Sequence, residues 1–140
     1  IGDKGNLIYN FTQIGLVHYY KKIDFELAEK YMEKSQAIID EFGTHEEAMI
    51  YTKVFLYLTY KQIGKTYDVQ QIFELLKNYQ NINFPLNYGL YELLEDNSYL
   101  ETAYNQVQKI ADTMEIELKS KFLSYPIPKA IIDKYNSVRT

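Results

Sequence analysis

Apolar residues recur along most of the chain at intervals of three and four, the spacing that gathers side chains on one face of an α-helix. The strict alternation of a half-buried β-strand does not occur over any useful length. The helical pattern covers residues 6–22, 25–42, 45–63, 66–79, 86–94 and 98–123, and a short last helix follows Pro128. The sequence therefore predicts an all-α chain.

The same intervals predict which side chains face the core. In the first helix they are Leu7, Phe11, Ile14, Gly15 and His18, with Ile8, Leu16 and Tyr19 widening the apolar face. In the second they are Ala28, Tyr31, Met32, Ser35, Ile38 and Ile39. In the third they are Ala48, Tyr51, Val54, Phe55, Leu58 and Gln62, with Ile50, Tyr57 and Tyr60 beside them. In the long helix they are Ala103, Val107, Ile110, Ala111, Met114, Leu118 and Phe122.

Residues with strong local preferences predict the helix ends. Asp24 is a good N-cap, because its carboxylate can accept from free amides of the next turn. Residues 44–47 and 98–101 have the capping-box pattern, and residue 66 is expected to open the fourth helix. Gly43 and Gly64 are expected to end helices.

Prolines predict further boundaries. Pro85 biases Phe84 to an extended conformation and makes residues 81–85 a break. Pro126 is expected to stop the long helix, and Pro128 suits the first turn of the last one.

Three helix starts share one form, a capping residue followed by an aromatic one. The aromatics are Phe25, Tyr67 and Tyr99, which are 42 and 32 residues apart. Each start follows another apolar helix through a short turn, so the unit is a helical hairpin. Because one hairpin cannot cover its own apolar face, we expect the hairpins to stack.

Two motifs in the first hairpin carry a family resemblance: Phe11-x-x-Ile14-Gly15-x-x-His18, then Asp24-Phe25-x-x-Ala28-x-x-x-Met32-x-x-Ser35. Together they resemble a tetratricopeptide repeat (TPR). The turn is about one residue longer than in the family, and His18, Met32 and Ser35 replace the usual residue types. In the later hairpins Gln70 and Thr102 replace the small alanine of the second helix.

The resemblance implies a single right-handed solenoid over residues 1–140, with hairpins at about 6–42, 44–80 and 85–123 and a C-terminal extension over 124–140. Its concave face, lined by first helices, would receive a peptide or a partner domain. Residues 110–132 are similar to the ending of TPR arrays in large bacterial signalling proteins, where the array follows an ATPase, cyclase or transcription-factor module. We therefore expect a regulatory fragment of a longer protein.

Composition excludes several classes of partner. Apolar residues make up 46% of the chain, enough for a core, and 15 Lys/Arg are interleaved with 19 Asp/Glu for a formal charge of −4. Without a basic block we expect no direct binding to nucleic acid. No apolar run is long enough for a membrane span, and the first residues lack a secretory signal. The absence of cysteine fits a cytoplasmic address.

Candidate chemistry is sparse. Residues 45–49, His-Glu-Glu-Ala-Met, fall short of a zinc-protease motif because Met49 stands where the second histidine belongs. His45 is then an exposed residue at a helix start, and His18 is a packed repeat residue. Phosphate loops, nucleophile elbows and dinucleotide glycine patterns do not occur. We predict no enzyme activity, no catalytic or metal-binding residues and no cofactor.

The chain has 15 tyrosines, and several lie on predicted first helices. Tyrosine gives an interface a large area, little entropy loss and one polar tip. The candidate partner-binding residues are Tyr9, Tyr19, Tyr20, Tyr57 and Tyr60. The alternative is that most of them belong to the core.

The sequence thus predicts a protein-interaction scaffold that binds a protein or peptide and has a regulatory role. Two alternatives stay open. The exposed apolar face of the first hairpin could be a homodimer seam in a structural domain. The chain could also be a regulatory phosphatase or another enzyme on a helical scaffold.

Overall fold

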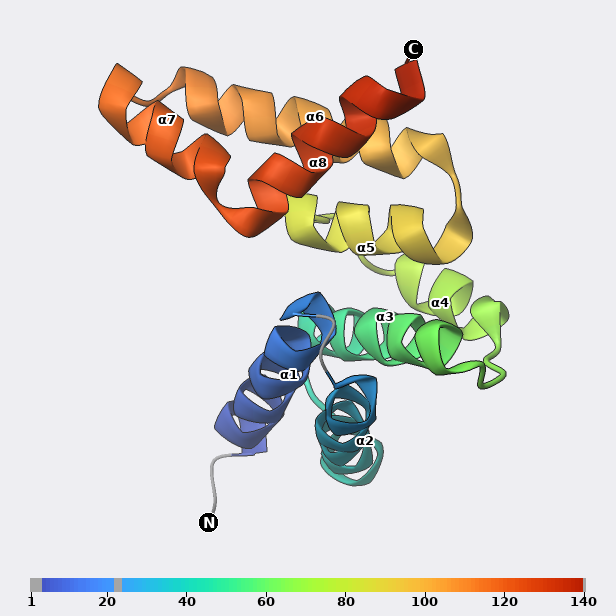
Figure 1. Cartoon of the computed structure of the whole chain (residues 1–140). Helices are drawn as coiled ribbons and strands as arrows, with labels where there is room; N and C mark the ends of the chain where they lie inside the picture. The colour runs from blue at the N-terminus through green and yellow to red at the C-terminus, as the bar shows by residue number, and fades with distance from the viewer. Residues whose placement is uncertain (1–3, 22–23, 140) are drawn as a thin grey trace. The chain divides into compact units, whose positions relative to one another are not determined.

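The computed structural model describes residues 4–21 and 24–139, and over these residues the chain forms eight α-helices and no β-strand (Figure 1). The all-α prediction is confirmed. The helices are α1 (Lys4–Lys21), α2 (Phe25–Phe42), α3 (Glu46–Ile63), α4 (Val69–Leu76), α5 (Phe84–Leu94), α6 (Asn97–Asp112), α7 (Ile116–Ser124) and α8 (Pro126–Arg139).

The helices fall into two compact units. The first, Ile1–Gln80, contains α1 to α4, and the second, Asn81–Thr140, contains α5 to α8. The division lies where Pro85 predicts a break in the helical pattern. Stacking of the hairpins into one repeat domain stays a prediction.

The core of the first unit is built around α3. This helix packs against α2 and α4 and also touches α1, while α1 and α2 pack against each other as a hairpin. Every residue from Val54 to Thr59 is consequently buried. On α2 the buried residues are Ala28, Met32, Ser35 and Ile39, all of them on the predicted core face.

The predicted core face of α1 is confirmed in part, and the buried stripe lies towards its Ile8 and Tyr19 side. Its buried residues are Ile8, Thr12, Gly15 and Tyr19, so Gly15, Ile8 and Tyr19 of the predicted face are confirmed and Thr12 was not predicted. Leu7 and Ile14, predicted to be buried, are 38% and 39% exposed. The polar Thr12 lies in the core, where α2 and α3 supply its hydrogen-bond partners.

Three buried hydroxyl groups form a hub between α1, α2 and α3. Thr12 Oγ1 lies 2.9 Å from Ser35 Oγ and 3.0 Å from Thr52 Oγ1, and Ser35 donates to the carbonyl oxygen of Ile8 at 2.8 Å. Because the single proton of Ser35 goes to Ile8, Thr12 must donate to Ser35 and Thr52 must donate to Thr12. The hub satisfies side chains that would otherwise be costly to bury.

Gly15 allows α1 and α2 to approach closely. A Cβ atom at this position would lie 2.8 Å from Met32 Cε, closer than ordinary van der Waals contact. Met32 is fully buried. The absence of a side chain at Gly15 on α1 therefore leaves space for the side chain of Met32 on α2.

Some helix ends agree with the sequence-based predictions. The amide of Leu27 donates to Asp24 Oδ1 at 3.0 Å, which confirms Asp24 as the N-cap of α2. Gly43 and Gly64 end α2 and α3 with φ values of 72° and 80°. Tyr125 follows α7 and precedes Pro126, so the predicted stop near Pro126 is also confirmed.

Other helix starts differ from the predictions. His45 rather than Thr44 caps α3, with Nδ1 accepting from the amide of Ala48 at 3.4 Å. Aspartates cap α4 and α6: Asp68 Oδ1 accepts from the amide of Gln70 at 3.0 Å, and Asp96 Oδ1 from the amide of Ser98 at 2.9 Å. In these two cases a carboxylate close to the predicted hydroxyl residue is the stronger acceptor.

The start of α5 also corrects a prediction. Phe84 is helical, because Asn83 caps the helix through the amide of Leu86, 3.3 Å from Asn83 Oδ1. Pro85 then occupies the first turn, where an amide hydrogen is not needed by the helix.

The predicted long helix over 98–123 is divided in two. α6 ends at Asp112 and α7 begins at Ile116. Thr113 Oγ1 donates to the carbonyl oxygen of Ile110 at 2.7 Å, a side-chain bond that competes with helix continuation. Ile116 and Leu118 are 85% and 58% exposed, so the apolar stripe of α6 does not continue into α7.

The second unit has its own core, in which α6 packs against α5, α7 and α8. The buried cluster consists of Tyr88, Leu100, Ala103, Val107 and Ile131. A polar network joins α5 to α6: Asn87 Nδ2 donates to Gln106 Oε1 at 3.0 Å, and Gln106 Nε2 donates to the carbonyl oxygen of Ile82 at 2.8 Å.

Candidate functional site: the α2–α3–α4 groove

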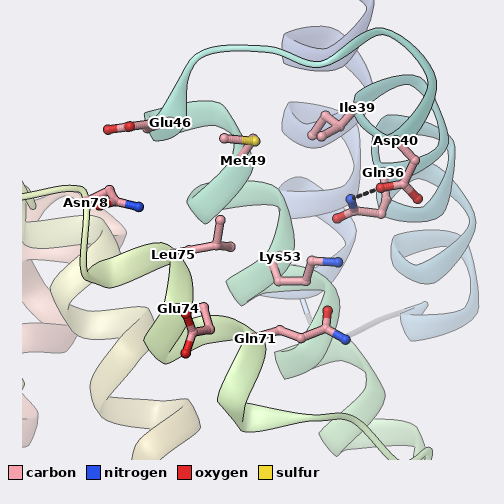
Figure 2. Close-up of a pocket in the computed structure, with 10 residues that line it drawn as sticks. All are labelled: Gln36, Ile39, Asp40, Glu46, Met49, Lys53, Gln71, Glu74, Leu75 and Asn78. Carbon is pink, nitrogen blue, oxygen red and sulfur yellow. Dashed lines mark hydrogen bonds between the residues drawn. The ribbon is translucent and has the colours of Figure 1, made fainter.

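A groove of about 560 Å³ opens between α2, α3 and α4, entirely within the first unit (Figure 2). Its volume lies in the span of roughly 300–1,000 Å³ that is usual for binding pockets. We name it the α2–α3–α4 groove, and it is lined by Gln36, Ile39, Asp40, Glu46, Met49, Lys53, Gln71, Glu74, Leu75 and Asn78.

Three apolar side chains, one from each helix, form the floor of the groove. Ile39 is buried, whereas Met49 on α3 and Leu75 on α4 are half-buried, and Leu75 extends from α4 towards α3 (Figure 2). The position of α4 is set in part by the hydroxyl of Tyr57, which donates to Gln71 Oε1 at 2.9 Å. The floor therefore offers apolar area on elements that other contacts hold in place.

Charged and polar groups surround this floor. Asp40 accepts a hydrogen bond from Gln36 Nε2 at 2.9 Å, which orients both side chains. Glu74 forms an ion pair with Lys77 at 2.9 Å, but both side chains are about two-thirds exposed at 67%, so the pair adds little stability. Burial lowers the pKa of Lys53, and the negative charge of Asp40 partly opposes this.

The predicted partner-binding tyrosines lie elsewhere in the first unit. Tyr19 and Tyr57 are buried, Tyr20 and Tyr60 are half-buried, and Tyr9 is 63% exposed. The rings of Tyr19 and Tyr20 are 5.4 Å apart, and those of Tyr57 and Tyr60 are 6.1 Å apart, which makes two separate pairs. None of the five lines the groove. Their role in partner binding stays a prediction.

The second tyrosine pair stands near a small charged cluster. Glu29 on α2 forms an ion pair with Lys65, which follows α3. Burial, followed by the negative charges of Glu33 and Glu29, raises the pKa of Tyr60. Burial and the charge of Glu29 also raise the pKa of Glu33. The phenol of Tyr60 therefore stays protonated at neutral pH.

The two histidines are separated and have structural contacts. The ring of His18 stacks on Tyr31 with centroids 6.3 Å apart, and His45 is the exposed cap of α3. Within residues 4–21 and 24–139, no group of three or more His, Asp or Glu side chains is arranged to hold a metal ion.

Comparison with known proteins does not assign the chain to a family. Neither the known family models, nor the curated proteins, nor the solved structures contain a match to the chain. Among the helices that the structure describes, none combines the length and the apolar character needed to cross a membrane.

Proposed function

We propose that the chain is a protein-interaction module that binds a peptide segment of a partner protein in the α2–α3–α4 groove. The observation behind this proposal is the groove itself, with an apolar floor from three helices and a polar rim. Recognition grooves commonly combine apolar contact area with a few polar groups that fix orientation.

The packing of the first unit supports a repeat origin for this groove. α1, α2 and α3 contact one another in the pattern that two successive stacked hairpins require. We therefore retain a degenerate TPR array in a regulatory protein as the proposed family. The resemblance implies that a partner binds on the first helices of the hairpins, which here are α1 and α3. The groove instead combines the first helix α3 with the two second helices, α2 and α4. The proposal places the peptide in the groove.

The proposal is tested by selecting binders from a random peptide display library with the full chain. A Leu75→Lys variant puts a charge on the groove floor. The matched control is Phe73→Lys on the same helix, because Phe73 is 41% exposed and does not line the groove. Circular dichroism of each variant checks that the helices are retained.

We expect the selected peptides to lose at least about tenfold in affinity for Leu75→Lys, since one buried apolar contact is exchanged for a desolvated charge. Their affinity for Phe73→Lys should change by less than about twofold. Peptides that bind both variants equally, or a selection without enrichment, would refute groove binding. Light scattering on the same samples would show whether self-association occludes the groove, which would also count against the proposal.

A further inference from the structure

We propose that the α2–α3–α4 groove is selective for a cationic amphipathic segment, one that places apolar side chains on the floor and Lys or Arg side chains at the rim. This selectivity rests on the proposed function, peptide binding in the groove, and it specifies the charge and the apolar pattern of the bound segment.

The charges of the lining residues favour a cation. The groove carries three carboxylates, Asp40, Glu46 and Glu74, and one ammonium group, Lys53. Their net formal charge is therefore −2. A concave surface lined by one sign of charge focuses its field and attracts the opposite charge.

The uncommitted hydrogen-bonding capacity of the groove also favours a donor. The Nε2 amide group of Gln36 donates a hydrogen bond to Asp40 Oδ1, so the orientation of the amide is fixed by an acceptor-only partner. The Oε1 atom of Gln36 is buried and has no hydrogen-bond partner among the described residues. Figure 2 shows this oxygen on the opposite side of the amide from Asp40. An ammonium or guanidinium group, which has only donors, would satisfy this acceptor.

The positive charge of Lys53 is not enough to make the groove bind anions. Its ammonium group lies 5.6 Å from the centre of the Tyr57 ring, and it also experiences the charge of Asp40. An anion that approached Lys53 would meet the three carboxylates of the same groove. The lysine instead reduces the attraction for a cation.

The floor requires an apolar stripe as well as charge. Met49 is long and unbranched, and such side chains adapt to different apolar partners. Ile39 and Leu75 complete a surface that one or two aliphatic side chains can cover. A helix with apolar residues spaced three and four apart and lysines between them presents both features together.

The experiment uses three labelled synthetic peptides of about 14 residues with leucines at the same helical spacing. The remaining positions are mostly Lys, mostly Glu or mostly Gln. Binding to the full chain is followed by fluorescence anisotropy at low and at physiological salt. The variants are Asp40→Asn, Lys53→Met and, as a control with the same charge change on the same helix, Glu26→Gln. Glu26 is exposed and does not line the groove.

We expect the lysine peptide to bind at least about tenfold more tightly than the glutamate peptide and to weaken with salt. Asp40→Asn should weaken it by about two- to fivefold, and Lys53→Met should strengthen it by a similar factor. Glu26→Gln should have little effect. Tighter binding of the glutamate peptide, weaker binding to Lys53→Met, or an equal effect of Glu26→Gln and Asp40→Asn would overturn the inference.

The outcomes separate this inference from the proposed function. A glutamine peptide that binds as tightly as the lysine peptide, and that loses binding to Leu75→Lys, would remove the charge selectivity and leave groove binding in place. Absence of binding by all three peptides would overturn the inference, and the display selection would then decide the proposed function independently.

Discussion

The contact between Gly15 and Met32 gives a prediction in which the sign of a mutational effect depends on a second residue. In most helices a Gly→Ala change is stabilising, because alanine has less backbone freedom to lose on folding. Here the added methyl group would lie 2.8 Å from Met32 Cε, 3.0 Å from Cγ and 3.1 Å from Sδ. We expect Gly15→Ala to destabilise the first unit.

The expected magnitude combines two terms. Helix propensity favours alanine over glycine by about 1 kcal/mol. Overpacking of a well-filled core costs about 1–3 kcal/mol, and the added methyl group would meet Cγ of the fully buried Met32 as well as the end of its side chain. Gly15→Ala should therefore lower the free energy of unfolding by up to about 2 kcal/mol.

The same substitution should stabilise a chain that already carries Met32→Ala. That change alone costs about 2–5 kcal/mol, and it removes the atoms that the new methyl group would meet. In that background Gly15→Ala should raise the free energy of unfolding by about 1 kcal/mol. The two sites are thus coupled by about 1–3 kcal/mol, within the range found for residues in contact.

The assay is residue-resolved hydrogen exchange of the α1 and α2 amides in the wild type, both single variants and the double variant. Gly5→Ala, at an exposed position of the same helix, is the control for the backbone contribution. If Gly15→Ala raised protection by the same amount with and without Met32, the close approach of α1 and α2 would be refuted.

Two further predictions concern buried polar groups. Thr12→Val should cost about 1–3 kcal/mol and more than Thr52→Val, because Thr12 is both donor and acceptor in the hub; equal losses in urea unfolding would contradict the assigned donors. Burial, with a smaller contribution from the charge of Glu92, raises the pKa of Tyr88 to about 12 from an ordinary value of 10. The folded state therefore holds this proton more tightly, so its contribution of at most about 3 kcal/mol is complete below pH 10 and is lost as the pH rises to about 12. Tyr88→Phe should remove that part of the alkaline destabilisation, and an unchanged pH profile would contradict the burial.

Local chemistry made part of the fold predictable. The core face of α2 was identified because Ala28, Met32, Ser35 and Ile39 stand on one stripe bounded by charged residues. Asp24 and Gly43 were identified because caps depend on the residue itself and its immediate neighbours.

The burial of Thr12 on α1 depends on distant residues and was not predictable in this way. The polar character of Thr12 argues against burial, and its partners lie 23 and 40 residues away in the sequence. Apolar residues such as Met114 and Leu118 likewise continued the pattern of α6 across a turn that contains neither glycine nor proline.

The groove could not be located from the sequence, because its floor forms only when α4 lies against α3. One signal was present. α4 carries Phe73, Leu75 and Leu76 in addition to Ile72, yet of these only Ile72 is buried, so the helix has more apolar residues than its core contact uses. An excess of this kind on a short helix indicates a second surface for contact.

The division of the chain at Gln80 and Asn81 has a practical consequence for every measurement of ligand binding. A peptide in the groove raises the unfolding free energy of the unit that holds it by mass action. The amides of α5 to α8 belong to the other unit, so their hydrogen-exchange rates are an internal reference in the same sample. Slower exchange confined to α1 to α4 would report a specific complex, and a uniform change along the chain would report altered solution conditions.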